Sequence, residues 1–469
     1  MPTPQPIPFW TQSYEGRTKK VTAEELVNWY LEANPQNAKF PYVLCPTPGL
    51  KLLTTVGDGP HRGCTKLGED LFCVSGTRLY VVHSDLSILE VGEIAGTGNV
   101  RMAASDTQVI IATDEHFYCA TASSILDLPE MFMCGVAYQD GYGIAAQAGT
   151  NKFWISATDN LASWAGGDVM NADAKADCVT GLASAHRLVW VFKGETIEGW
   201  YNSGAAAFPF QRVESGFLEV GCMAPHSIAI LGDQLFWVGH DHKVYTAKGF
   251  SPQEISTPGI TAFIEARNSP QTALAWAYTQ AGHTFYVLTF GDKTMVYDTS
   301  TGLWHYRKSQ GISRWRANSH EYIWRKHVVG DYENGKLYQL DLKTYADDGA
   351  EIRREATSAP IAQGGSMLSM PELFVDMKMG VGLDGLSDWG MPGFVQGSDP
   401  KLLLSWSDDG GETFGNELEL SIGKIGERLK QARVNRLGAF RERAIRIAVS
   451  DPIEAIVIGA YARMEVLDV

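Results

Sequence analysis

The chain has 469 residues, enough for about two to four domains. Its 45% hydrophobic content and moderate charge exclude an intrinsically disordered protein, and its formal net charge of −15 excludes tight, nonspecific nucleic-acid binding over the whole surface. No apolar stretch approaches the roughly 18 residues of a membrane span, and the N-terminal MPTPQPIPFW lacks the features of a secretory signal. The seven cysteines form no C-x-x-C pair, so we expect free thiols in a soluble protein made in a reducing cytoplasm.

Residues 1–46 predict an extended N-terminal arm. Four prolines precede Trp10 and favour extended backbone. Thr22–Glu25 carries a capping-box pattern, which predicts one short helix running through Trp29 and Tyr30. Exposed arms with aromatic anchors often dock on a neighbouring subunit, so we take Trp10, Trp29 and Tyr30 as candidate interface residues. An arm folded onto its own propeller is an equal alternative.

Residues 47–342 repeat one phrase, a hydrophobic strand, a polar or glycine turn and a second strand that ends near an aromatic residue. The copies recur at roughly 36 to 49 residues, the period of a β-propeller blade. Asn334-Gly335 adds a strong hairpin signal. We expect a propeller of six to eight blades, with seven favoured. The copies are Leu71–Val82, Val109–Ala120, Phe153–Trp164, Leu188–Tyr201, Leu235–Ala247, Phe285–Asp298 and His327–Asp341.

Residues 343–469 change rhythm and predict a separate antiparallel β-sandwich. Apolar residues alternate at period two in Glu372–Met379, Lys401–Trp406 and Ala444–Val449, and the chain closes on a strand-like Ala455–Val466. The sequence therefore predicts an all-β protein in three parts: the arm, the propeller and the sandwich.

One turn in this last region fits the Asp-box pattern S-x-D-x-G-x-T-F of sialidase-like propellers. Its serine and aspartate hydrogen-bond the backbone of the turn, and its aromatic residue packs beneath. We interpret the box as architectural. Its residues are Ser407, Asp409, Gly411, Thr413 and Phe414.

No residue pattern specifies a catalytic, metal or cofactor site. A sialidase needs an arginine cluster with a tyrosine nucleophile and carboxylates, and no spacing singles these out. His240-Asp241-His242 falls on a predicted turn with no third ligand. We expect no enzyme activity and no cofactor. A glycan-binding or glycan-cleaving, sialidase-like propeller remains the alternative.

The segment Lys424–Arg446 is basic in an acidic chain, with eight Lys and Arg against two Glu. Such a stripe suits a nucleic-acid backbone or an acidic partner surface. It equally suits a solvated face with internal ion pairs. We take Arg433, Arg436, Arg441 and Arg443 as candidate interface residues.

The stretch Glu90–Ala103, EVGEIAGTGNVRMA, resembles a segment of the packaged-DNA-stabilisation proteins of short-tailed bacteriophages, also called tail accessory factors or tail hubs. The basic run, the proline-led final strand from Pro452 and the early turn Pro46–Leu50 are similar to that family too. Elsewhere the likeness is blade rhythm, which unrelated propellers share.

The resemblance implies a structural protein of the virion tail, assembled in the host bacterial cytoplasm. It implies a hexameric ring below the dodecameric head-to-tail adaptor, with a tail needle or another distal tail protein, such as a tailspike or fibre, docked beneath. The ring would stabilise packaged DNA in the head and form part of the ejection channel. Double-stranded viral DNA would pass through without sequence-specific binding. A solitary cellular propeller scaffold is a third alternative.

Overall fold

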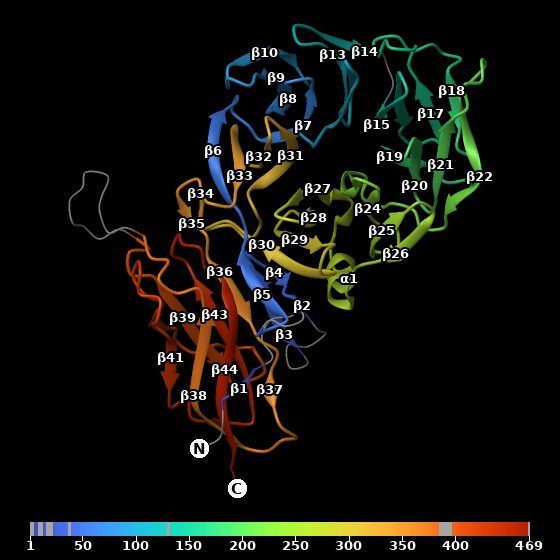
Figure 1. Cartoon of the computed structure of the whole chain (residues 1–469). Coiled ribbons are helices and arrows are strands. Elements are labelled where there is room, and N and C mark those ends of the chain that lie inside the picture. The colour runs from blue at the N-terminus through green and yellow to red at the C-terminus, as the bar shows by residue number, and fades with distance from the viewer. Residues whose placement is uncertain are drawn as a thin grey trace. The chain divides into compact units, whose positions relative to one another are not determined.

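The computed structural model describes residues 4–7, 13–15, 22–35, 39–128, 132–383 and 396–467. Strands dominate, as predicted, and the helical elements of these residues are short: α1 (Pro258–Glu265) and the 3-10 turns η1 (Pro225–Ser227) and η2 (Pro270–Thr272). The chain divides into two compact units (Figure 1). We call residues 52–291 and 315–340 the propeller unit, and residues 1–51, 292–314 and 341–469 the sandwich unit.

The propeller unit contains five four-stranded antiparallel sheets and a sixth blade of four strands that belongs to a six-stranded sheet, which confirms the predicted propeller. An antiparallel hairpin, β27 (Leu274–Gln280) and β28 (His283–Phe290), lies between the fifth and sixth sheets in chain order. The first two sheets are β7 (His61–Leu67), β8 (Asp70–Ser75), β9 (Arg78–Val82) and β10 (Ile88–Glu93), then β11 (Arg101–Ala104), β12 (Val109–Ala112), β13 (Phe117–Ala120) and β14 (Ile125–Leu128). The next two are β15 (Met133–Gln139), β16 (Tyr142–Gln147), β17 (Lys152–Ile155) and β18 (Val169–Asn171), then β19 (Val179–Ala185), β20 (Leu188–Lys193), β21 (Ile197–Asn202) and β22 (Phe210–Leu218). The last two are β23 (Ala229–Leu231), β24 (Gln234–Val238), β25 (Val244–Lys248) and β26 (Ser251–Glu254), then β31 (Ala317–Ile323), β32 (Lys326–Asp331) and β33 (Lys336–Asp341) with β6 (Gly49–Thr55).

The first strands of successive sheets contact one another around a closed ring: β7, β11, β15, β19, β23, β27, β31 and back to β7. The hairpin β27–β28 therefore holds a place in the ring beside the six four-stranded blades. Apolar side chains fill the space between neighbouring blades; for example, Phe72 and Val81 of the first sheet share one buried cluster with Val109 and Ile111 of the second. Each such side chain contributes about 1.5–3 kcal/mol through burial, so stacking stabilises blades that could not bury both faces alone.

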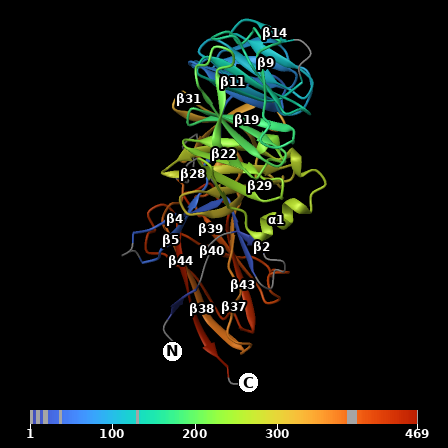
Figure 2. The ribbon, with the colours of Figure 1, turned by 90° about the vertical axis from the view of Figure 1, so that its right-hand side faces the viewer.

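The sandwich unit has two sheets around one apolar cluster, which confirms the predicted β-sandwich (Figure 2). Leu373 and Ala460 on one sheet and Leu404 and Ile447 on the other are fully buried in that cluster. The first sheet contains β1 (Gln5–Pro6), β4 (Trp29–Ala33), β5 (Tyr42–Pro46), β38 (Leu368–Met377), β41 (Ala432–Asn435), β42 (Ala439–Phe440) and β44 (Val457–Val466). The second contains β2 (Tyr14–Glu15), β3 (Ala23–Val27), β29 (Lys293–Asp298), β30 (Leu303–Arg307), β36 (Arg354–Thr357), β37 (Ile361–Ala362), β39 (Lys401–Ser407), β40 (Leu418–Ser421) and β43 (Glu442–Val449). A small hairpin, β34 (Ala346–Asp347) and β35 (Ala350–Glu351), completes the unit.

The predicted helix near the N-terminus is wrong, because these residues form the two strands β3 and β4. Asn28 separates the strands at a φ of 56°. Its side-chain amide donates to the carbonyls of Lys308 and Arg353, at 2.9 and 2.8 Å. The capping pattern favours a helix only locally, and pairing of β3 with β36 and of β4 with β5 overrides it.

These pairings also replace the predicted arm over residues 22–46, whose strands are part of the sandwich sheets. The sandwich unit takes strands from three separate stretches of chain. The expected bounds of arm (1–46), propeller (47–342) and sandwich (343–469) stay a prediction.

Candidate functional site

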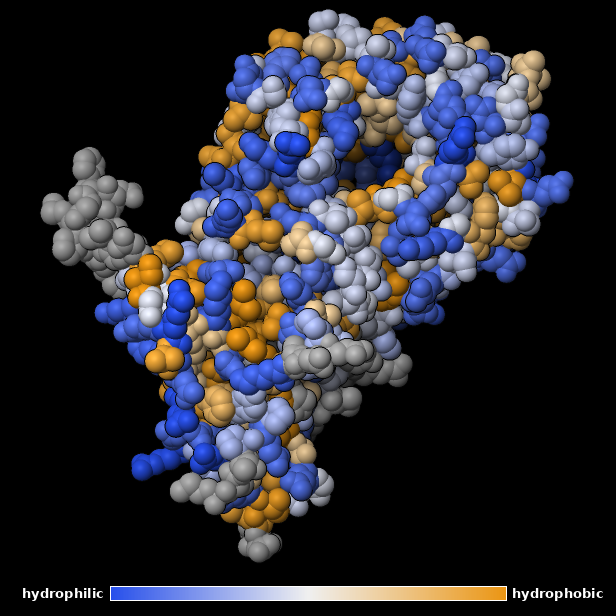
Figure 3. Space-filling model, viewed as in Figure 1, coloured by the Kyte–Doolittle hydropathy of each residue, from blue (hydrophilic) through white to orange (hydrophobic). Residues whose placement is uncertain are grey.

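The propeller unit encloses a central channel with a volume of about 610 Å³ (Figure 3). All seven inner strands of the ring line it. Alanines supply much of the wall, and the charged or titratable groups among the lining are few. They are Arg62, Arg101, Tyr138, His226, His320, Glu321 and Tyr322, with the thiol of Cys64.

Arg62 fastens the segment that carried the family resemblance. Its side chain, 3% exposed, donates to backbone carbonyls of Gly98 at 2.6 Å, Ala95 at 3.0 Å, Gly76 at 3.1 Å and Ile94 at 3.4 Å. Burial lowers the pKa of this guanidinium, against the opposing effect of nearby acidic groups. The Arg62 side chain therefore holds the β10–β11 connection in place, which is an architectural task.

Two glycines in the same region lie where a neighbouring side chain leaves no room for a Cβ atom. A Cβ at Gly63 would lie 2.7 Å from the Val100 side chain, and one at Gly98 would lie 2.6 Å from the carboxylate of Asp114. The backbones at these positions are too close to their neighbours for a larger residue without a shift.

Arg101 lies at the start of β11, and its Nε and Nη2 atoms are buried without a hydrogen-bond partner among the described residues. Burial lowers the pKa of Arg101 to about 10. Neither Arg62 nor Arg101 was singled out from the sequence. The available signal was a charged residue placed inside an otherwise small and apolar strand pattern.

The buried thiols of the propeller unit do not have the character of nucleophiles. Burial raises the pKa of Cys64 to about 12 and that of Cys134 and Cys222 to about 11. A reactive cysteine instead needs a depressed pKa that yields thiolate near neutral pH.

Within the described residues, no group of three or more His, Cys, Asp and Glu side chains is arranged to hold a metal ion. The histidine-rich turn has local partners: the Nδ1 atom of His240 accepts from the Gly221 amide at 3.2 Å, and Asp241 accepts from the Tyr245 hydroxyl at 2.7 Å. None of the described helices has the length and apolar character needed to cross a membrane.

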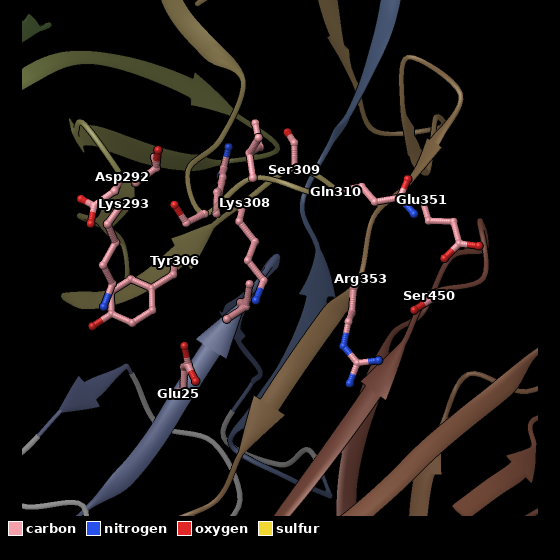
Figure 4. A pocket seen from close by; sticks show the side chains of 16 residues that line it. Glu25, Asp292, Lys293, Tyr306, Lys308, Ser309, Gln310, Glu351, Arg353 and Ser450 are labelled. Atoms are coloured by element: carbon pink, nitrogen blue, oxygen red, sulfur yellow. The ribbon is translucent and has the colours of Figure 1, made fainter. Parts of the chain in front are cut away.

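The sandwich unit has its own pocket of about 670 Å³, with polar and charged walls (Figure 4). Glu25 comes from β3, and Lys293 and Tyr306 come from the hairpin β29–β30. The Lys293 ammonium lies 3.8 Å from the centre of the Tyr306 ring, a cation–π contact. Arg353 pairs with Glu355 at 3.0 Å and also with Glu417, outside the lining. Cations and carboxylates alternate here, without a set of groups converging on one reacting atom.

The aromatic interface candidates differ from expectation. Trp10 lies outside the described residues. Trp29 and Tyr30 are buried inside the sandwich unit, at 0% and 5% exposure, and the Trp29 indole donates to the Ala455 carbonyl at 2.8 Å. Their side chains therefore anchor the chain to itself and offer no surface to a neighbouring subunit.

The basic candidates divide into exposed and buried residues. Arg433, Arg436 and Arg441 are exposed; Arg433 pairs with Glu372 at 2.8 Å, and Arg441 donates to the Gly365 carbonyl at 2.7 Å. Arg443 is 1% exposed, which corrects its expected interface role. A contact surface on this run therefore has to rest on the first three.

Arg443 instead binds the turn next to the Asp-box. It donates to both carboxylate oxygens of Asp408, at 2.6 and 2.7 Å, and to the Leu437 carbonyl at 2.8 Å. Its guanidinium also lies 4.2 Å from the centre of the Phe440 ring. This contact is a bidentate arginine–carboxylate pair, which fixes geometry as well as charge.

The Asp-box has the hydrogen bonds that its pattern predicts. The Ser407 hydroxyl donates to Asp409 at 2.5 Å and accepts from the Gly411 amide at 2.9 Å. Asp409 also accepts from the Thr413 amide and hydroxyl, and hydrogen bonds from Ser407 and Thr413 hold the pKa of Asp409 below its usual range. Phe414 packs against the guanidinium of Arg446, whose centre is 3.5 Å from the ring centroid.

Comparison with known proteins gives two family matches. A family described as bacteriophage P22 Gp10, beta-propeller, matches residues 7–345, and one described as bacteriophage P22 Gp10, beta-sandwich, matches residues 354–465. No curated protein matches the chain.

Solved structures give weaker likenesses. A streptogramin B lyase is 10% identical, with 66% of this chain and 98% of that chain covered and a TM-score of 0.44. BamB from Moraxella catarrhalis is 12% identical, with 62% and 97% covered and a TM-score of 0.36. The computationally designed Ika8 protein is 10% identical, with 63% and 99% covered and a TM-score of 0.40.

Proposed function

This chain belongs to the bacteriophage P22 Gp10 family and is a phage structural protein, and on that premise we propose that it acts as a tail hub. In this role several copies form a closed ring below the head-to-tail adaptor, stabilise the packaged DNA and line part of the ejection channel. The observation that carries the proposal is that both family models match this chain, the propeller model over residues 7–345 and the sandwich model over residues 354–465. Membership of a structural family argues for a non-enzymatic role in the virion.

The physical character of the chain supports such a role. A ring of blades joined by buried apolar clusters resists deformation, because the interior of each blade pair is close-packed. A ring subunit in the path of a moving polymer needs that stiffness. The net charge of −15 repels the DNA phosphates, so the duplex would slide without sticking.

We propose six copies per ring, with lateral or axial contacts made in part by the exposed basic residues Arg433, Arg436 and Arg441. A basic patch on an acidic protein suits an acidic neighbour, either a second copy of the chain or the adaptor. A tail needle, tailspike or fibre protein would bind the opposite end of the ring. Assembly would take place in the host cytoplasm.

The experiment is reconstitution of the full-length chain with its adaptor ring, followed by native mass measurement and electron microscopy. We expect the chain to add to the adaptor as a closed ring, even where it is monomeric alone. The triple variant R433A/R436A/R441A should bind the adaptor at least tenfold more weakly while keeping its unfolding midpoint. The matched control is Arg187→Ala, an exposed arginine of the propeller unit.

Two results would overturn the proposal. One is failure of the wild-type chain to associate with the adaptor in any stoichiometry. The other is robust cleavage of host polysaccharide by the purified chain, which would make it a glycan-cleaving propeller. Unchanged adaptor binding by the triple variant would instead show that the basic run is a solvated face.

A further inference from the structure

We propose that the central channel of the propeller unit is a binding site for a small phosphate-class oxyanion, held by the guanidinium of Arg101. The site is internal to each chain and is separate from any channel that a ring of chains would enclose. It does not depend on the proposed tail-hub function.

The first observation is the missing partner of Arg101. Arg101 is half-buried, and its Nε and Nη2 atoms are buried without a hydrogen-bond partner among the described residues. Two buried arginines of this chain have acceptors: Arg62 donates to four backbone carbonyls, and Arg443 donates to the carboxylate of Asp408 and to a carbonyl. Buried donors without acceptors are costly, and an anion bound to this guanidinium would offset part of that cost.

The second observation is the charge balance of the lining. Glu321 is the one carboxylate among the residues that line the channel, and it already faces a cation, since its Oε1 lies 3.7 Å from the Lys66 ammonium. Arg101 therefore lacks a countercharge within the lining. Arg101 lines the channel together with residues of β15 and with His226, from the segment before β23.

The third observation is room and hydrogen-bonding capacity next to Arg101. Small residues on neighbouring inner strands, such as Ala103, Ala137 and Ala183, leave a channel of about 610 Å³, a volume typical of small-ligand sites. Burial, and after it the charge of Arg101, lowers the pKa of His226 well below its usual range, so that imidazole is neutral at pH 7 and keeps one N–H donor.

The chemistry of a guanidinium selects the ligand class. Its planar N–H groups match two oxygens of one oxyanion, and the pair is stronger in a site shielded from water. A compact phosphate fits the channel and finds a cationic donor from β11 and a neutral donor from His226. The anion would join strands on different sides of the ring and so stabilise the closed propeller.

The test uses the full-length protein, freed of phosphate and held at constant ionic strength with sodium chloride. Calorimetric titration with inorganic phosphate should give one saturable site per chain. At a hundredfold excess over the dissociation constant, phosphate should raise the unfolding midpoint by about 5–10 °C. The variant R101M should lose both responses, and its midpoint in phosphate-free buffer should equal or exceed that of the wild type. The control Arg187→Met should bind phosphate as the wild type does.

A second variant and a second ligand test the proposal further. R101K retains the charge without the planar fork and should weaken phosphate binding at least tenfold, which decides the question where R101M does not fold. Citrate, tested in parallel, separates a carboxylate site from a phosphate site, and binding of citrate alone would overturn the phosphate assignment. Absence of saturable binding to the wild type, or equal binding by R101M or R101K, would overturn the site itself.

Discussion

Replacing Arg443 with methionine tests whether the basic run is partly internal structure. The substitution keeps the length of the side chain and its contact with Phe440, but removes the charge and all the donors. It deletes two charge-assisted hydrogen bonds to Asp408 and one to the Leu437 carbonyl. A purely interfacial arginine would tolerate this change without loss of stability.

The expected cost follows from the exposure of each partner. The Asp408 side chain is 43% exposed, so water replaces much of the lost pairing and this part is worth about 1 kcal/mol. The buried Leu437 carbonyl loses its hydrogen-bond donor, which should lower the unfolding free energy by about 1–3 kcal/mol. The lost cation–π contact adds roughly 0.5–1 kcal/mol, which better burial of methionine partly offsets. We expect a net loss of about 3 kcal/mol.

The assay is urea unfolding of the full-length chain, followed by tryptophan fluorescence and far-ultraviolet circular dichroism. The matched control is Arg441→Met in the same run, whose side chain is exposed and should cost less than about 0.5 kcal/mol. The double variant R443M/D408N should cost less than the sum of the two single variants, because they share one interaction. A loss below about 1 kcal/mol for R443M, or one equal to the control, would refute the reasoning.

Three further outcomes test the fold. Arg62→Met should cost about 3–5 kcal/mol of unfolding free energy in urea titrations, because four carbonyls lose a charged donor. A cost no larger than that of Arg187→Met would contradict the structural role of these four hydrogen bonds. Asp409 has a folded-state pKa below its unfolded value of about 3.9. Its contribution to the stability of the folded protein is therefore present above that pH and is lost as the pH falls toward the folded-state pKa. The unfolding midpoint should therefore fall more steeply below about pH 4 in the wild type than in Asp409→Asn, and parallel profiles would exclude this role. Gly335→Ala should cost about 1–3 kcal/mol by the same unfolding assay, since its Cβ would meet the Gly57 carbonyl oxygen at 2.1 Å, and a neutral effect would argue against that close approach.

The propeller was predictable because its signals are local. Strand pairs such as Leu71–Val82 alternate about a polar turn, and in the structure they are β8 and β9 of one blade. Gly76 in that turn has a φ of 58°, as the hairpin pattern requires. Asn334-Gly335 was also a valid hairpin signal. The close approach of Gly335 to the Gly57 backbone, however, was not visible in the sequence.

The N-terminal strands were not predictable in the same way. Thr22–Glu25 satisfies a helix-capping pattern locally, but β3 pairs with β36 from a distant part of the sequence, and β4 pairs with the next strand, β5. A single sequence carries no record of such pairings. Trp29 therefore looked like an anchor for another chain, although its indole is buried against Ala455.

The burial of individual side chains in the basic run was equally hard to predict from the sequence. Counting charges in Lys424–Arg446 cannot separate Arg443, which is buried in β43, from Arg441, which is exposed two residues earlier. Alternation in the strand gives a partial signal, because residues two apart share a face. Arg443 lies on the face of the buried Ile445 and Ile447, so its charge required a partner there.

The central claim is that this phage structural protein forms a ring in the tail. Electron microscopy of virions that contain the chain, with the copies counted at the level just below the head-to-tail adaptor, tests it most directly. The account predicts a closed ring of six copies around the DNA channel. Particles that lack the chain at this level, or that carry it as separate copies without a ring, would contradict it.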